Sequence, residues 1–117
     1  MSADRLKEYL RQIGESSQNA VNFLGGMQYA EFQEDIKTQS AVAMSLVIVG
    51  EAASRIEERF PEFIEAHPEI PWNAIRGMRN RIAHDYFLVN FEVIWSTVAV
   101  DLPLLMVQIA AIKSGQA

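Results

Sequence analysis

Cysteine is absent from this 117-residue sequence, and histidine occurs only twice. The lack of thiols excludes a disulfide framework and a thiolate metal site. The neighbouring His84 and Asp85 could not hold a metal ion alone, so we expect neither a metal nor another cofactor. The first ten residues, MSADRLKEYL, lack the apolar stretch of a secretory signal, which predicts a cytoplasmic protein.

Lysine and arginine are also scarce, at ten residues against 15 acidic ones, which gives a net charge of −5. This balance argues against broad, non-specific binding to nucleic acid, because such binding rests on many cationic contacts to phosphate. It still allows a small basic site. Three of the ten cations, Arg76, Arg79 and Arg81, fall within six positions, so the positive charge is local.

No segment alternates apolar and polar residues over the length of a strand, so the sequence predicts an all-α protein. Half of the residues are hydrophobic, which is enough to bury a core. Start and stop signals, among them Gly25-Gly26 and Pro61, predict main helices over residues 2–24, 40–60, 71–86 and 91–113. Residues 29–39 are expected to form a brief helix or the first turns of the next main helix, and a short helical turn is expected within 61–71. The fold class is an antiparallel bundle of four main helices plus short helices, in one domain over residues 1–117.

The last of these helices is apolar enough to raise a second interpretation, because residues 93–112 have the length of a membrane span. Asp101 would then lie near the bilayer centre, at a cost of roughly 3 kcal/mol. Pro103 would break the hydrogen-bond ladder nearby. We therefore predict a buried helix of the bundle, capped by Asn90 and kinked at Pro103, and no membrane partner.

One stretch of the third main helix, RNRIAHDYF (79–87), combines two arginines, an asparagine, a histidine and a tyrosine. An ideal helical wheel predicts one apolar stripe toward the core, formed by Ile75, Met78, Ile82 and Tyr86. His84 lies about 180° from Ile75, and Asn80 lies one turn earlier on the same side. Arg76 and Arg81 flank this polar face. An exposed histidine on a solvated face is the plain interpretation, whereas a histidine among cationic and neutral donors suits the binding of a phosphate.

Arg79 does not share the face of His84, because five positions of an ideal helix separate the two by about 140°. Either the helix unwinds near Ala83, or two copies of the stretch meet across a symmetric interface. A twofold dimer would place an arginine and a histidine from each chain in one cleft.

Three residues outside this face also require an interpretation. Glu51 lies within an apolar helix, and we favour an ion pair with Arg55, four residues later. The alternative is that Glu51 orients Arg79 or Arg76. Trp72 and Trp95 are interpreted as core or dimer-interface residues rather than as platforms for stacking bases.

The residues RNRIAHDY fit a pattern of Arg, four residues, His, one residue and Tyr. With the flanking blocks EDIKTQSAV, IVGEAASRI, HPEIPWNAIRGMRNRIAHDYF and VIWSTVAVDLP, nearly the whole chain resembles the HEPN-domain toxins of the HepT kind. Those toxins are the partners of minimal nucleotidyltransferase (MNT) antitoxins.

The resemblance implies a homodimeric helical bundle and a metal-independent ribonuclease with its site at the dimer cleft, in a toxin–antitoxin pair of a type II or VII-like kind. Arg79 and His84 would be the catalytic pair, with Asn80 in the polar position after the arginine. Tyr86 would accept AMP from the cognate MNT antitoxin, which would silence the toxin.

The residues themselves can support RNA cleavage without a metal. The neighbouring 2′-OH is the nucleophile, a histidine can move protons near neutral pH, and an arginine fork can stabilise the phosphate. One chain supplies one suitable histidine, because His67 lies in a proline-bounded connection, whereas a dimer supplies two. The same composition also fits an alternative, a non-catalytic helical module that binds nucleotide or a partner protein beside a nucleotidyltransferase.

Overall fold

The computed structural model describes residues 2–115 and contains helices and turns but no strand in that range. The predicted all-α bundle is confirmed. Four long helical segments form it, and shorter helices lie between them. The segments are α1 (Ser2–Leu24), α2 (Tyr29–Gln33), α3 (Ile36–Arg59), α4 (Pro61–Ala66), α5 (Trp72–His84), a 3₁₀ turn (Tyr86–Leu88), α6 (Phe91–Ser96), a π-helical turn (Thr97–Asp101) and α7 (Leu102–Gly115).

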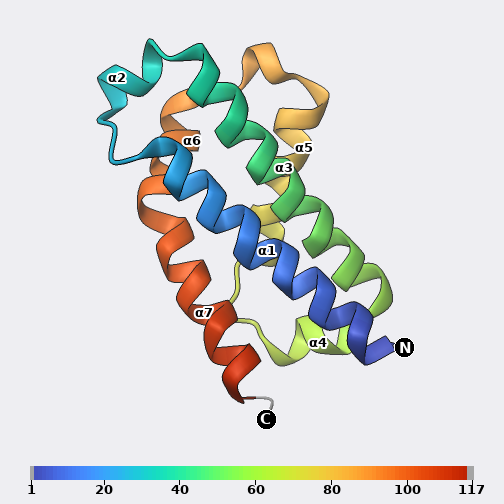
Figure 1. The fold of residues 1–117 in the computed structure, drawn as a ribbon. Helices are drawn as coiled ribbons and strands as arrows, with labels where there is room; N and C mark the ends of the chain where they lie inside the picture. The colour runs from blue at the N-terminus through green and yellow to red at the C-terminus, as the bar shows by residue number, and fades with distance from the viewer. Residues whose placement is uncertain (1, 116–117) are drawn as a thin grey trace.

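Successive main helices run in opposite directions along the bundle (Figure 1). α1 packs along both α3 and α7, and α5 packs along the other side of α3. The core between them is aliphatic, with Leu10, Ile13, Val42, Val49, Ile56, Ile94 and Val98 almost completely buried. Both tryptophans pack at this core, as predicted, and each indole N–H donates to a backbone carbonyl oxygen, that of His67 for Trp72 and that of Met27 for Trp95.

The first helix ends at the predicted glycines, because Gly25 and Gly26 both have positive φ, at 58° and 78°. A left-handed conformation after a helix favours glycine, which has no Cβ to clash with the backbone. The second main helix begins at Ile36, so residues 29–39 contain both a brief helix, α2, and the first turn of α3, the two alternatives left open for them. The carboxylate of Asp35 accepts a hydrogen bond from the N–H of Thr38 at 2.9 Å and thereby caps α3. This bond also holds the pKa of Asp35 below its usual value.

The final helical segment begins as predicted, since the Oδ1 of Asn90 accepts from the N–H groups of Glu92 and Val93 at 2.9 and 3.3 Å. A π-helical turn over Thr97–Asp101 precedes Pro103, at the place where the sequence predicted a kink. Proline lacks an N–H and its ring crowds the preceding turn, so a wider turn accommodates it there.

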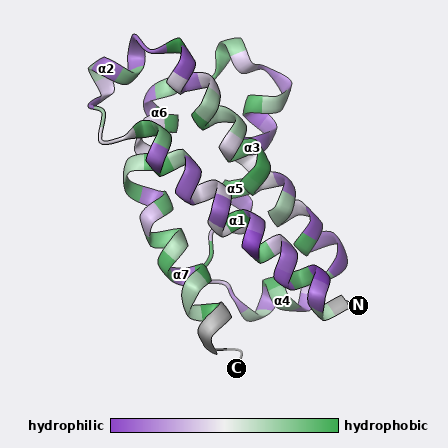
Figure 2. Cartoon of the chain, viewed as in Figure 1, coloured by the Kyte–Doolittle hydropathy of each residue, from purple (hydrophilic) through white to green (hydrophobic). Residues whose placement is uncertain are grey.

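The prediction that this segment is buried needs correction, because only one of its faces is buried. The opposite face of α7 is exposed and consists of Pro103, Leu104, Val107, Ala110 and Ala111. Figure 2 shows α7 as predominantly hydrophobic, in contrast to α1. The whole segment from Phe91 to Ile112 has the length and apolar composition of a membrane span, and 28% of its most apolar window is buried inside the bundle. A helix that is apolar on all sides normally has a covering partner.

The cap of α6 can be tested by the substitution Asn90→Ala, which removes the acceptor of two backbone N–H groups. We expect the free energy of unfolding, measured by urea denaturation, to fall by about 1 kcal/mol. Asn90→Asp keeps an acceptor and should stay within about 0.5 kcal/mol of the unmodified chain. An Asn90→Ala protein as stable as the unmodified chain would contradict the cap.

Candidate functional site

α5 carries all the predicted site residues except Glu51 and Tyr86, and it remains helical as far as His84. Its apolar stripe faces the core as predicted, with Met78 and Ile82 buried and Ile75 partly buried, whereas Tyr86 lies beyond the end of the helix and is also partly buried. The chain leaves the helix only at Asp85. The suggested unwinding near Ala83 is therefore wrong, and Arg79 and His84 lie on different sides of a regular helix.

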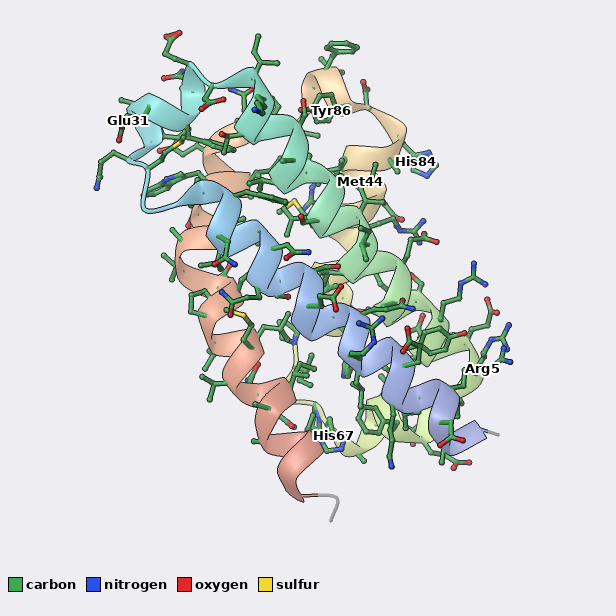
Figure 3. The ribbon with its side chains drawn as sticks, in the orientation of Figure 1. Arg5, Glu31, Met44, His67, His84 and Tyr86 are labelled. Carbon is green, nitrogen blue, oxygen red and sulfur yellow. The ribbon has the colours of Figure 1, made fainter. Side chains whose placement is uncertain are left out.

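His84 points away from the bundle into solvent (Figure 3). It borders an open pocket of about 580 Å³, which we call the His84 pocket. The polar residues that line this pocket are Asn80, Arg81, His84, Asp85 and Asn90. The structure thus brings three of the predicted site residues together, while Arg79 does not line this pocket. Among residues 2–115, no three His, Asp or Glu side chains cluster in a way that could hold a metal ion.

Arg79 extends from α5 toward α3, away from the His84 pocket. Its Nη1 lies 2.9 Å from Oε1 of Glu51, and its Nη2 donates to the Oγ of Ser54 at 3.1 Å. Its Nε is buried and has no hydrogen-bond partner among the described residues. The side chain is 24% exposed, so the guanidinium reaches the surface beside the more exposed Glu51.

Tyr86 follows α5 by two residues and opens the 3₁₀ turn. Its ring is partly buried and makes edge-on contacts with Phe91 and Phe87, at centroid distances of 5.6 and 6.0 Å. The two residues after it are apolar and point into solvent, with Phe87 93% and Leu88 78% exposed. The tyrosine is therefore fixed by its ring, in a turn whose other side chains are accessible.

A second hollow of about 460 Å³ separates α5 from α7, and we call it the α5–α7 groove. Residues of the core reach its walls, namely Leu46, Val49, Met78, Leu102 and Leu105. Arg81 lines it from α5, while Glu69 and Asp101 contribute carboxylates. Met78, Arg81 and Val93 also line the His84 pocket, so the two hollows adjoin.

In a comparison with known proteins, a family profile described as ribonuclease HepT-like matches residues 2–112. The chain belongs to this family. A Thermococcus cleftensis protein named "Probable ribonuclease HepT" is 39% identical over 99 residues, which cover 85% of this chain and 87% of that protein. No solved structure matches the chain significantly.

Two further relatives of this HepT-like chain are named as candidate RNases. The one from Methanocaldococcus jannaschii is 35% identical over 98 residues, or 84% of this chain and 78% of its own length. The one from Caldanaerobacter subterraneus subsp. tengcongensis is 33% identical over 106 residues, which cover 91% of this chain and 92% of that protein.

In this HepT-like chain the carboxylate of Glu51 pairs with Arg79 across two helices. The favoured ion pair between Glu51 and Arg55 was therefore wrong, and the alternative, in which Glu51 contacts Arg79, is the one the structure contains. Spacing along one helix could not decide between these partners, because the competing arginine lies on α5.

Arg76 is held apart from Arg79 and from the His84 pocket by its own contacts. It pairs with Glu57 of α3, and it also donates to the side chain of Asn73 and to the carbonyl oxygen of Trp72. The structure places it neither in the His84 pocket nor beside Arg79 as a partner.

Sequence reasoning did not single out Ser54 or Asp85. Ser54 follows Glu51 by three positions, so the two lie on one face of α3, and this spacing could have suggested Ser54 as a second contact for a residue opposite. Asp85 becomes part of the His84 pocket because the chain turns there, which no local pattern indicated.

Proposed function

We propose that this chain is a metal-independent endoribonuclease that acts as the toxin of a toxin–antitoxin pair in the cytoplasm. The observation that carries the proposal is the polar face of α5, where an exposed His84 stands with Asn80 and Arg81 over an open pocket in a HepT-like chain. An imidazole among cationic and neutral donors suits a phosphodiester. Arg79 and His84 are the proposed catalytic residues, with Asn80 and Arg81 as supporting contacts and Arg76 outside the site.

The proposed reaction needs only groups that RNA and the protein supply. The 2′ oxygen attacks the adjacent phosphorus, and the bond from phosphorus to the 5′ oxygen breaks, which leaves a 2′,3′-cyclic phosphate and a free 5′-hydroxyl. One histidine accepts the 2′-OH proton, and an acid returns a proton to the leaving 5′ oxygen. The guanidinium of Arg79 stabilises the negative charge on the phosphate.

We further propose that two copies of the chain complete the site. Each chain offers one histidine on this face, and its Arg79 lies on another side of α5, so one chain does not bring the pair together. The α5–α7 groove adjoins the His84 pocket, and Leu104 of the exposed α7 face lines the groove, which supports a second copy as the cover of groove and face. A twofold interface is self-complementary, and Arg81 faces a groove that also holds Asp101 and Glu69.

Tyr86 is the proposed point of control by an MNT nucleotidyltransferase antitoxin. Its hydroxyl oxygen would attack the α-phosphorus of ATP bound to the antitoxin, with loss of its proton and of pyrophosphate. The resulting AMP group would add bulk and negative charge two residues from His84. The exposed side chains of Phe87 and Leu88 support this proposal, because a modifying enzyme must bind the segment that carries the acceptor.

The catalytic assignment predicts that the purified chain cleaves RNA in the presence of EDTA and that its expression alone stops growth. His84→Ala and Arg79→Ala should each reduce cleavage at least about a hundredfold. Because His84 is exposed, His84→Ala should change the free energy of unfolding by no more than about 0.5 kcal/mol. An unmodified chain that cleaves no RNA, but binds a partner protein equally well after His84→Ala, would favour the non-catalytic helical module.

The shared site predicts that two inactive variants restore each other. A mixed dimer of Arg79→Ala and His84→Ala chains, co-expressed with two different tags and purified through both, should regain substantial activity, because one arginine and one histidine remain for a common cleft. Neither variant alone should cleave RNA. An isolated mixed dimer with no more activity than either parent would contradict a common cleft in which one arginine and one histidine suffice.

Control by AMP transfer predicts a mass increase in AMP units after co-expression with a cognate MNT antitoxin, together with loss of RNA cleavage. Intact mass spectrometry should find no added mass on Tyr86→Phe, whereas Tyr29→Phe serves as the matched control and should still be modified. Added mass that persists on Tyr86→Phe would place the acceptor elsewhere.

A further inference from the structure

Arg79 lies at a point where α5 approaches α3 closely, beside the buried Gly50. A Cβ at position 50 would overlap the Cβ of Arg79, and would lie 2.7 Å from its Cγ and 3.3 Å from the carbonyl oxygen of Ile75. A glycine therefore allows the first atoms of the arginine side chain to lie directly on α3. The start of the side chain is fixed before any ligand arrives.

The far end of the side chain is also held by α3. Glu51 faces Nη1 at 2.9 Å, and Ser54 accepts from Nη2 at 3.1 Å. Two residues three positions apart on one helix thus hold two different nitrogens of one planar group, which restricts both its position and its rotation. An arginine with its rotamer already selected loses less conformational entropy when it binds a phosphate.

A second pair between the same two helices provides a comparison. Arg76 and Glu57 have nearly the same exposure as Arg79 and Glu51, at 22% and 42% against 24% and 47%. Every side-chain nitrogen of Arg76 has a partner nearby, as expected of a structural ion pair. The Nε of Arg79 is buried and has no hydrogen-bond partner in the part of the chain that the structure describes, a cost that a purely structural pair has no reason to retain.

From these contacts we propose that Gly50, Glu51 and Ser54 form a cradle that orients the guanidinium of Arg79 for the phosphate of RNA. Glu51 and Ser54 are then positioning residues, which act through Arg79 and do not touch the substrate. The proposal rests on the proposed function, in which Arg79 stabilises the phosphate.

Neutralising Glu51 should change activity in opposite directions, depending on whether the carboxylate orients Arg79 or only shields its charge from RNA. The carboxylate of Glu51 repels a phosphate, so its neutralisation should strengthen RNA binding and raise activity if the pair only hides Arg79. If the carboxylate orients Arg79, its neutralisation should lower the rate of the chemical step, because misplacement of a catalytic group by about 1 Å can cost a hundredfold in rate.

The test compares steady-state cleavage of one RNA by the unmodified chain and by Glu51→Gln, Glu51→Asp and Ser54→Ala. We expect Glu51→Gln to lower kcat by about tenfold to a hundredfold while KM changes by less than about threefold. Glu51→Asp, which restores the charge on a shorter side chain, should recover part of kcat, and Ser54→Ala should show a smaller loss. Glu57→Gln is the matched control, because it breaks the ion pair between α3 and α5 that involves Arg76 and leaves the contacts of Arg79 in place. It should change kcat by less than about twofold.

A second measurement does not depend on cleavage. The side-chain ¹⁵N spectrum, with the Arg79 signal assigned by its loss in Arg79→Ala, should show slow rotation of the guanidinium in the unmodified chain. Rotation should become fast in the double variant Glu51→Gln with Ser54→Ala, and circular dichroism should confirm that this variant is still helical.

The outcomes are distinguishable. If the unmodified chain cleaves RNA, and Glu51→Gln leaves kcat within twofold or raises activity, the cradle is overturned while the proposed function stands. If the unmodified chain cleaves no RNA, the proposed function fails and the rotation of Arg79 alone decides the cradle. A guanidinium that rotates equally fast with and without Glu51 and Ser54 would also overturn it.

Discussion

The close approach of α3 and α5 at Gly50 is the constraint on which the candidate site depends. Because residue 50 has no side chain, the stem of Arg79 lies on α3 and its guanidinium is directed to Glu51 and Ser54. The regular helix then turns His84 to another side, over its own pocket. One short helix therefore presents an arginine and a histidine on different sides, and a single chain does not bring the two side chains together.

The exposed apolar face of α7 is the second feature of the structure that points to a second copy of the chain. This helix is apolar on all sides, yet only the face toward α1 and the core is covered. The α5–α7 groove exposes residues of the core beside the His84 pocket. The groove and the candidate site thus lie next to each other, and the proposed docking of a second copy would cover the groove and complete the site.

Much of the fold could be predicted from local patterns, because helix ends carry their own signals. Gly25-Gly26 and Asn90 act through nearby backbone groups, and the structure uses them as the sequence indicated. The start of α3 was less clear, since residues 29–39 are helical in composition throughout, and Asp35 separates two helices within them. The wheel placed His84 outside and Met78 inside because α5 is a regular helix over its whole length.

The sequence by itself determined the helices, their apolar faces and the different directions of Arg79 and His84 on α5, since all of these follow from the period of a helix. Only the tertiary structure decided that Glu51 meets Arg79 and not Arg55, that Ser54 joins it, and that α7 keeps an exposed apolar face. The physical reason is that such pairings depend on how closely two helices distant in sequence approach. Here Gly50 allows α5 to approach α3 closely at Arg79. The local sequence around Gly50 does not reveal that effect, because Arg79 lies on another helix.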